Sequence, residues 1–556
     1  MTQRKAVIFK LLVSLVSLFT ALPVTAAAAA VQVVELRGDA EQQALIRAGK
    51  DEGEGGEKKK LGTPYFDNLL VKAVNATLPK PSRAARGQSP IYGATDRRKP
   101  QTGGVRHEEI SVKAPFRMPP IKVPVFPKRD FVVTDFGAKP GGEFDNTEAI
   151  RRAIEACNKA GGGRVVIPTG RWLTGAVHLK SNVNLHLAKG AVLSFSDDPK
   201  DYLPAVRSSW EGWECFNYSP LIYAFECENV ALTGEGKIEP RMGTWKKWFA
   251  RPPAHMEALR RLYTMGSTGV PVERRRMAEG GNNLRPQLIQ FNRSRNVLIE
   301  DVKIRNSPFW TIHLLLCDSV VVRRVDISAH GHNNDGIDPE GTRNLLVEDC
   351  RFDQGDDAIA IKSGTNHDGW RLGRPSENIV VRNSTVINGH QLVAIGSELS
   401  GGVRNVYVHD CRFEAPDPKA GPFNVLYVKT NRRRGGFVEN ITLENIDAAN
   451  VKFKMGVLGI ETDVLYQWRT LVPAYEERLT PIRGITMRNV RVGETATPFR
   501  ILGDKDRPVR DVLLDNITVG TVRGRKSRYE NVGHVRETNV RIGTFIEEPD
   551  KENRNR

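Results

Sequence analysis

The chain reads NNDGIDPEGTRNLLVEDCRFDQGDDAIAIKSG from Asn333 to Gly364. Two turns that carry aspartates, at residues 333–335 and 355–357, flank the short apolar run Leu345–Val347. The chain therefore leaves one carboxylate-bearing turn and reaches a second one about one structural repeat later. The predicted fold depends on whether these two turns stack on each other in successive coils.

Eight segments with a shared pattern follow one another, as in repeat architectures. Each contains a short β-branched strand, a polar corner and a second short strand. They begin at Asn296, Ser319, Asn344, Asn378, Asn405, Asn440, Gly484 and Asp511. The sixth residue after each start is apolar or small: Val302, Val325, Cys350, Ser384, Cys411, Ile446, Val490 and Ile517. This fixed ladder, with Gly, Asn and Asp at the corners, predicts an all-β fold, a right-handed parallel β-helix. An antiparallel sandwich would not require the common register.

The 556 residues divide by composition into four parts. Residues 1–28 have basic residues, an apolar run and a string of alanines, the pattern of a secretory signal peptide that is too short to span a membrane. Residues 29–125 are polar and rich in Gly, Lys and Pro, so we expect a partly disordered extension or linker. Residues 126–546 are expected to form the β-helix catalytic domain, and 547–556 a polar tail. We therefore predict an exported protein, periplasmic or secreted.

An amphipathic helix is predicted near the start of the β-helix, after Asp145. Ile150, Ile154 and Cys157 share one face, and the glycines at 161–163 end the helix. The first coil of a β-helix has a bare edge that would pair with other chains unless it is covered. We expect this segment to be an N-terminal capping helix.

The formal net charge of +17 favours an acidic partner. For an exported protein, a polyanionic polysaccharide fits better than nucleic acid. Cys350 and Cys411 occupy equivalent ladder positions two coils apart, beyond the ~7 Å reach of a disulfide at roughly 4.8 Å per coil. We expect these two to be buried free thiols, whereas a disulfide between Cys215 and Cys227 stays open.

The repeat register brings chemically active residues together. Asp356 and His390 each lie twelve residues after a repeat start, so they should stack in adjacent coils. Asp335 lies on the coil before and Lys429 on the coil after. Like charges buried together raise the pKa of at least one carboxyl, which can then stay protonated and donate a proton. A pair of carboxyls with unequal pKa values is what glycosidic bond cleavage requires.

A zinc site is the alternative interpretation of the same region. It would use His330, His332, Asp335 and Asp356, because His-x-His with carboxylates can bind zinc. Turn residues separate His332 from Asp335, and this spacing implies no chelating geometry. We therefore expect no metal at this site.

Four motifs in this order resemble those of glycoside hydrolase family 28, the polygalacturonases. They are Asn333-Asn334-Asp335, Gly355-Asp356-Asp357, Gly389-His390-Gln391 and Tyr427-Val428-Lys429. The resemblance extends over roughly Phe131 to Phe545 and implies a right-handed parallel β-helix that hydrolyses α-linked galacturonic acid chains with inversion and without a metal. Position by position, it implies Asp356 as the general acid, Asp335 and Asp357 as the pair that activates water, His390 as the histidine that sets the protonation of the acid, and Lys429 as the cation that binds a galacturonate carboxylate.

The chain departs from this family pattern at three motif positions. Asn334 stands where the family usually has Thr. Gln391 replaces a Gly and should narrow the space near His390. Tyr427 replaces an Arg and removes one cation, which Arg432 and its two basic neighbours are candidates to supply. The predicted contacts with the substrate are Lys429, Asn333, Tyr427, Arg432 and Gln391.

Two long segments, Asp197–Ser219 and Glu239–Asn283, are predicted to close one end of the cleft. Their tryptophans, at positions 210, 213, 245 and 248, are expected to stack on sugar, so that the enzyme is exo-acting on galacturonan ends. The expected substrate is an acidic polysaccharide or oligogalacturonide, with no cofactor, no nucleic acid, no membrane partner and a monomeric protein. Alternatives are a hydrolase of rhamnogalacturonan or xylogalacturonan, a calcium-dependent β-helix lyase, and a non-catalytic adhesin.

Overall fold

The computed structural model describes residues 104–279, 282–415, 421–464 and 477–547. The predicted signal peptide and most of the predicted extension and tail lie outside these residues. No helix among the described residues is long and apolar enough to cross a membrane.

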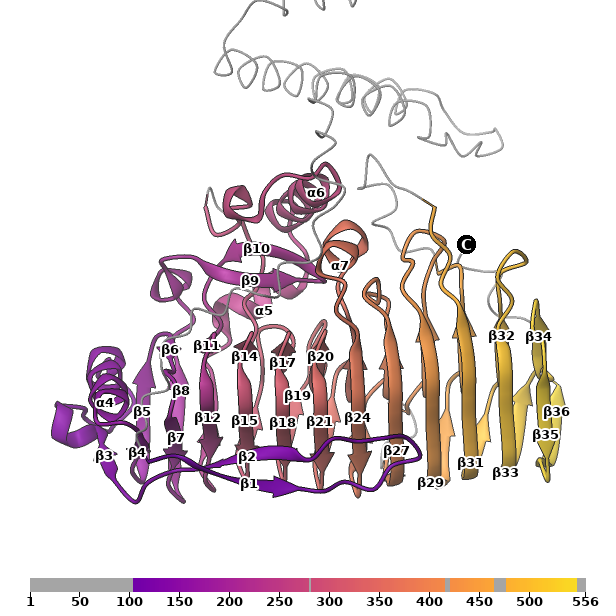
Figure 1. Cartoon of the computed structure of the whole chain (residues 1–556), viewed down its shortest axis with the longest axis horizontal. Coiled ribbons are helices and arrows are strands. Elements are labelled where there is room, and N and C mark those ends of the chain that lie inside the picture. Colours follow the sequence, from indigo (N-terminus) through magenta and orange to yellow (C-terminus); the bar gives the residue numbers. More distant parts are fainter. Residues whose placement is uncertain (1–103, 280–281, 416–420, 465–476, 548–556) are drawn as a thin grey trace, which may run out of the picture. The chain divides into compact units, whose positions relative to one another are not determined.

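Two sets of parallel strands wind into the right-handed parallel β-helix that the repeats predict (Figure 1). One sheet, which carries the site, contains β6 (Val177–His178), β11 (Ile222–Phe225), β14 (Ile289–Asn292), β17 (Ile312–Leu315), β20 (Ile337–Glu340), β23 (Ile359–Ile361), β26 (Gln391–Ile395), β28 (Asn424–Lys429), β30 (Gly456–Glu461), β32 (Phe499–Leu502) and β34 (Arg528–Glu530). We call this sheet the site sheet.

The remaining walls form one continuous parallel sheet. Its strands are β3 (Asp130–Val132), β4 (Gly163–Ile167), β5 (Gly170–Thr174), β7 (Val183–Leu187), β8 (Ala191–Phe195), β12 (Glu228–Thr233), β13 (Lys237–Ile238), β15 (Arg295–Glu300), β16 (Lys303–Arg305), β18 (Asp318–Arg323), β19 (Asp326–Ala329), β21 (Arg343–Glu348), β22 (Arg351–Gln354), β24 (Ser376–Arg382), β25 (Thr385–Asn388), β27 (Val403–Phe413), β29 (Val438–Phe453), β31 (Ile482–Thr495), β33 (Arg510–Gly524), β35 (Val535–Thr538) and β36 (Arg541–Glu547).

The repeat starts found in the sequence are sharp corners of the coil. All eight have a positive φ, between 53° and 69°, a left-handed conformation that Asn, Asp and Gly adopt more readily than other residues. The asparagines also hydrogen-bond from coil to coil: the Asn378 amide donates to Asn344 at 3.0 Å, and the Asn405 amide donates to Asn378 at 3.0 Å. The eight ladder residues are all buried, which confirms the predicted inward register.

The first coil is covered by α4 (Thr147–Lys159), as expected. Its apolar face buries Ile150, Ile154 and Cys157 in the core of the β-helix. All six cysteines are free and buried, so the alternative of a Cys215–Cys227 disulfide is wrong.

An ordered hairpin precedes the predicted domain start at residue 126. Strands β1 (Arg106–Ile110) and β2 (Ile121–Val125) pair antiparallel. Ile121 and Val123 pack on Leu298, Val321 and other outward-facing apolar residues of the larger sheet. These side chains would otherwise expose an apolar stripe, so residues 104–125 belong structurally to the β-helix rather than to a linker.

A second module interrupts the early coils. It comprises the hairpin β9 (Val206–Trp210) and β10 (Trp213–Asn217), with α5 (Gly243–Phe249) and α6 (Pro253–Ser267), and α7 (Asn366–Leu372) contacts α6 and β10 from a later coil. Trp210, Trp213 and Trp245 are fully buried. Trp210 stacks on Phe309 with ring centroids 4.7 Å apart. The expectation that these three tryptophans stack on sugar is therefore wrong, because Trp210 and Trp213 form the core of the module and Trp245 packs in the core of the β-helix.

Candidate active site

Three candidate residues lie just before successive strands of the site sheet begin. Asp335 lies two residues before β20, Asp357 two before β23, and His390 directly before β26. Backbone hydrogen bonds fix their levels: the Gly336 N–H donates to the Asp357 carbonyl at 2.9 Å, and the His390 N–H donates to the Asp356 carbonyl at 2.8 Å. The winding therefore brings the first three motifs to one edge of the site sheet, whereas Lys429 ends β28 and its side chain reaches Asp357 from the other end of the strand.

Asp356 and His390 form a hydrogen-bonded pair. Asp356 Oδ1 lies 3.0 Å from His390 Nδ1, and it also accepts from the backbone N–H of Asp357 at 3.0 Å. The His390 ring stacks on Phe423 with centroids 4.3 Å apart. Both side chains are partly exposed, so this pair can meet a ligand.

The electrostatics of this pair differ from the simple expectation that Asp356 holds a proton. Burial raises the pKa of Asp356. The hydrogen bond and charge of His390, together with the charges of Lys429 and Lys362, outweigh the effect of burial and lower the pKa to about 2. Burial lowers the pKa of His390, but Asp356 outweighs this and raises it above its ordinary value. In the free protein the proton of this pair therefore resides on His390.

Asp357 is buried and faces Lys429. The Lys429 ammonium donates to Asp357 Oδ2 at 3.1 Å. Burial raises the pKa of Asp357, and Lys429 opposes that rise. Lys429 thus already has a carboxylate partner in the protein, in addition to any carboxylate of a substrate.

Asp335 is held in place by its neighbour in the motif. The Asn334 amide donates to the backbone carbonyls of Ser307 and Phe309, both at 3.0 Å, which fastens the turn to the previous coil. Asn334 is therefore structural. Burial raises the pKa of Asp335 to about 8, reinforced by the charge of Asp356 and opposed by Lys362.

The other predicted substrate contacts take different positions. Asn333 is partly exposed, and its side-chain oxygen accepts from Arg285 at 3.2 Å. Tyr427 is also partly exposed, and its hydroxyl donates to Glu461 at 3.2 Å. Gln391 is buried, with 2% of its surface exposed.

Arg432 is engaged by acidic residues of its own region. Its guanidinium bonds to Glu477 at 2.6 Å, to Asp506 at 3.2 Å and to Asp504. A sugar carboxylate would have to compete with these three carboxylates. The structure therefore does not bring Arg432 into the group formed by Asp335, Asp356 and Asp357.

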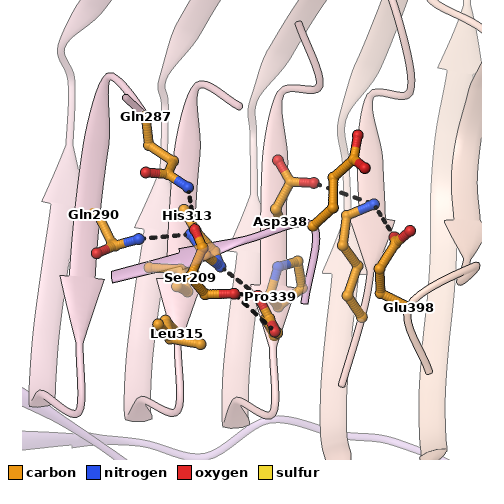
Figure 2. A network of polar contacts seen from close by, with 12 residues as sticks. Ser209, Gln287, Gln290, His313, Leu315, Asp338, Pro339 and Glu398 are labelled. Atoms are coloured by element: carbon orange, nitrogen blue, oxygen red, sulfur yellow. Dashed lines mark hydrogen bonds and ion pairs between the residues drawn. The ribbon is translucent and has the colours of Figure 1, made fainter. Parts of the chain in front are cut away.

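Three charged residues beside Asp335 were missed by sequence reasoning. The Lys362 ammonium lies 3.7 Å from Asp335, 3.6 Å from Asp338 and 3.2 Å from Glu398. Figure 2 shows Asp338 and Glu398 in this network. The alternation in Ala358–Lys362 (AIAIK) could have revealed Lys362. Because Ile359 and Ile361 point inward, Lys362 must point to the site face.

The outward face of the site sheet is covered on one side of these residues. Ser208 of the hairpin donates to Gln290 at 3.1 Å, and Ser209 donates to Glu340 at 3.3 Å. His313 lies between them, 2.9 Å from Gln290 and 2.9 Å from Glu340, with no exposed surface (Figure 2). The hairpin thus covers β14, β17 and β20.

On the other side, the outward face of the site sheet is accessible. Tyr427, Glu461 and Arg500, on β28, β30 and β32, are partly exposed. Within the described part of the chain, the surface beyond the aspartates is therefore covered toward the early coils and partly exposed toward the later ones.

A metal ion is not needed to balance the charges described. Asp356, Asp357 and His390 offer ligand atoms within 4.8 Å of one another. Each of them is already paired, His390 with Asp356 and Asp357 with Lys429. His330, part of the alternative zinc site, bonds instead to Asp353 at 2.9 Å.

Comparisons with known proteins agree with this architecture. The model described as "Glycosyl hydrolases family 28" matches residues 274–538. A probable polygalacturonase of Vitis vinifera is 28% identical over 403 residues, covering 70% of this chain and 73% of that protein. An exo-poly-alpha-D-galacturonosidase of Dickeya chrysanthemi is 28% identical over 297 residues, 49% of this chain and 48% of its own length.

Solved structures extend the similarity to most of the β-helix. The crystal structure of a hyperthermoactive exopolygalacturonase from Thermotoga maritima is 39% identical, covers 76% of this chain and 94% of its own, and superposes with a TM-score of 0.69. A family 28 exopolygalacturonase from Yersinia enterocolitica, at 21% identity and a TM-score of 0.58, shares the fold. With the family match and the identity to the Thermotoga protein over nearly its whole length, the chain belongs to glycosyl hydrolase family 28 and is a glycosidase.

Proposed function

We propose that this protein is an exo-acting polygalacturonase, which hydrolyses α-1,4-linked galacturonic acid at the ends of pectin chains with inversion. The observation that carries the exo assignment is the hairpin β9–β10, which covers the site sheet up to β20, the strand that follows Asp335. A polymer can then approach from the open side only, and its end must lie at the aspartates. The relatives named as exo-acting support the same conclusion.

The proposed chemistry divides the aspartates between two tasks. Asp356 with His390 serves as the general acid: the proton held on His390 passes through Asp356 to the leaving glycosidic oxygen as the bond to the sugar carbon breaks. Asp335 and Asp357 accept the proton of a water that attacks the same carbon from the opposite face. Inverting glycosidases use two carboxyl groups in this manner, about 6.5–9.5 Å apart.

Cations next to these carboxyls suit an acidic sugar. Lys429, at the border between the aspartates and the open side, is proposed to bind a galacturonate carboxylate as well as Asp357. Asn333 and Tyr427, both partly exposed, are the further proposed contacts. Gln391 and Arg432 are less suited, because one is buried and the other is bound to three acids.

Product analysis on galacturonic acid oligomers of defined length tests this function. We expect release of mono- or digalacturonate from the first minutes, little fall in viscosity of polygalacturonate, and a β-anomer as the first product in an NMR time course. A rapid fall in viscosity would contradict the exo assignment, and an initial α-anomer would contradict inversion. Rhamnogalacturonan and xylogalacturonan serve as comparison substrates, and ultraviolet absorbance of the product would reveal a lyase instead.

A further inference from the structure

Lys362 is a buried ammonium at the centre of three carboxylates. It directly follows β23, and 4% of its side chain is exposed. Its Nζ contacts Glu398, Asp338 and Asp335 at 3.2, 3.6 and 3.7 Å, and lies 4.6 Å from the centre of the Trp310 ring. An isolated buried ammonium would be costly, but carboxylates at this distance compensate for the lost solvation. Lys362 therefore stays charged although it cannot reach solvent.

Asp338 has no exposed surface, and its two oxygens have no donor among the described residues. A proton on Asp338 would supply the missing donor and make a hydrogen bond to Asp335. Burial and the charge of Asp335 raise the pKa of Asp338 well above its ordinary range, which agrees with this placement. Of the three carboxylates around Lys362, Glu398 then carries a negative charge because its pKa is lowered to about 2, and Asp335 gains one as the pH rises through its pKa of about 8.

Asp335 depends on this arrangement because it has few other supports. Its Oδ1 has no hydrogen-bond donor in the described part of the chain. The neighbouring Asn334 amide donates to two backbone carbonyls instead. The Lys362 ammonium lies within ion-pair distance of Asp335, as the Lys429 ammonium does of Asp357.

We propose that Lys362 is a positioning residue that favours the ionised form of Asp335, the form that activates water, and that Asp338 and Glu398 hold the ammonium in place. This inference rests on the proposed function, since it assigns Asp335 to the water-activating side. Lys362 itself does not touch the sugar. Its effect reaches the reaction through the charge state of Asp335, on which Asp356, Asp357 and Lys429 also act.

The test is the pH dependence of kcat/KM, whose acid limb reports a group that must be ionised in the free enzyme. Lys362→Met removes the cation and should shift the acid limb upward by about 1–3 pH units. Glu398→Gln should shift it downward, because it frees the ammonium for Asp335. Asp338→Asn should leave it in place, because Asp338 is already neutral and the amide keeps a hydrogen-bond donor. If these residues served packing alone, Lys362→Met and Glu398→Gln would lower stability without shifting the acid limb in opposite directions.

Two controls separate the possible outcomes. Arg275→Met breaks a buried ion pair with Asp368 inside the inserted module, so it should lower the melting temperature without moving the acid limb. An unchanged acid limb in Glu398→Gln would overturn the proposal even if Lys362→Met fails to fold. The pH dependence of the melting temperature reports the same ionisation without substrate. A wild-type protein that releases no galacturonate would therefore refute the proposed function, while the melting curves would still decide the role of Lys362.

Discussion

Asp335 and Asp356 occupy neighbouring coils of one β-helix, yet their surroundings are opposite. Asp356 is partly exposed and lies 3.0 Å from an imidazole. Asp335 is buried, accepts no short hydrogen bond to Oδ1, and faces Lys362 only at 3.7 Å. The pKa of Asp356 is consequently lowered to about 2 and that of Asp335 raised to about 8. The next coil thus determines the charge state of each aspartate, and a repeat of similar motifs can hold two different carboxyl groups.

The largest expected effect comes from removing the carboxylate that carries the proton to the leaving group. Asp356→Asn should lower kcat on oligogalacturonides by about 10² or more, because general acid catalysis contributes on that order. Release of reducing sugar measures this. Asp353→Asn is the matched control from the same coil, since Asp353 bonds to His330 and Asn388 on another wall. If Asp356→Asn kept more than about a tenth of the activity, the division between the two carboxyls would be wrong.

Stability should respond to the two aspartates with opposite signs. A raised pKa means that stability from Asp335 is present at low pH and lost as the pH rises toward about 8, because the unfolded chain ionises its carboxyls more readily. Asp335→Asn should therefore stabilise the protein at pH 8 by several kcal/mol, on the order of 5, with little gain at pH 4. Asp356 has a lowered pKa, so its contribution is present above the ordinary carboxyl value and lost in acid.

Asp356→Asn should accordingly destabilise at neutral pH, while it makes little difference near pH 2. Melting temperatures of both variants and the parent, measured from pH 3 to pH 9, check the two signs. Equal shifts in the same direction would mean that the surroundings of Asp335 and Asp356 do not differ as the contacts indicate.

The repeat predicted this wall but not its charge states. The starts at Asn344 and Asn378 mark left-handed corners, and counting from them places His390 over Asp356 without any structure. The counting works because these two coils share one register before and after a single bulge between Phe352 and Asp353. It needs only local sequence.

The surroundings of Asp335 could not be read in this way. The face of the site sheet beside it is covered by a hairpin inserted more than a hundred residues earlier in the chain, which bonds to Glu340 on the strand that follows Asp335. The prediction that Trp210 stacks on sugar failed because such contacts are not visible in the sequence. The sequence shows an aromatic residue in a long loop, but it does not show that this residue stacks on Phe309. Contacts between an insertion and the repeats have no fixed spacing.

The smallest expected effect is on stability when the imidazole beside Asp356 is removed. His390 has a raised pKa, so its contribution is complete below the ordinary histidine value and is lost as the pH rises through the raised one. His390→Gln should destabilise most near pH 5 and least near pH 9, by less than about 1 kcal/mol, because the partly exposed pair is screened by solvent. Without the imidazole, burial of Asp356 is no longer offset and its pKa should rise toward that of Asp335.

His409→Gln is the matched control for this variant. His409 Nδ1 bonds to Asp410 at 2.6 Å on the larger sheet, and no candidate residue of the site lies in that pair. Both variants lose a histidine–aspartate contact, but only His390→Gln should reduce the rate of galacturonate release. Equal rates for the two would show that the imidazole beside Asp356 supports the fold alone, and the contrast between the two carboxyls would then have no consequence for catalysis.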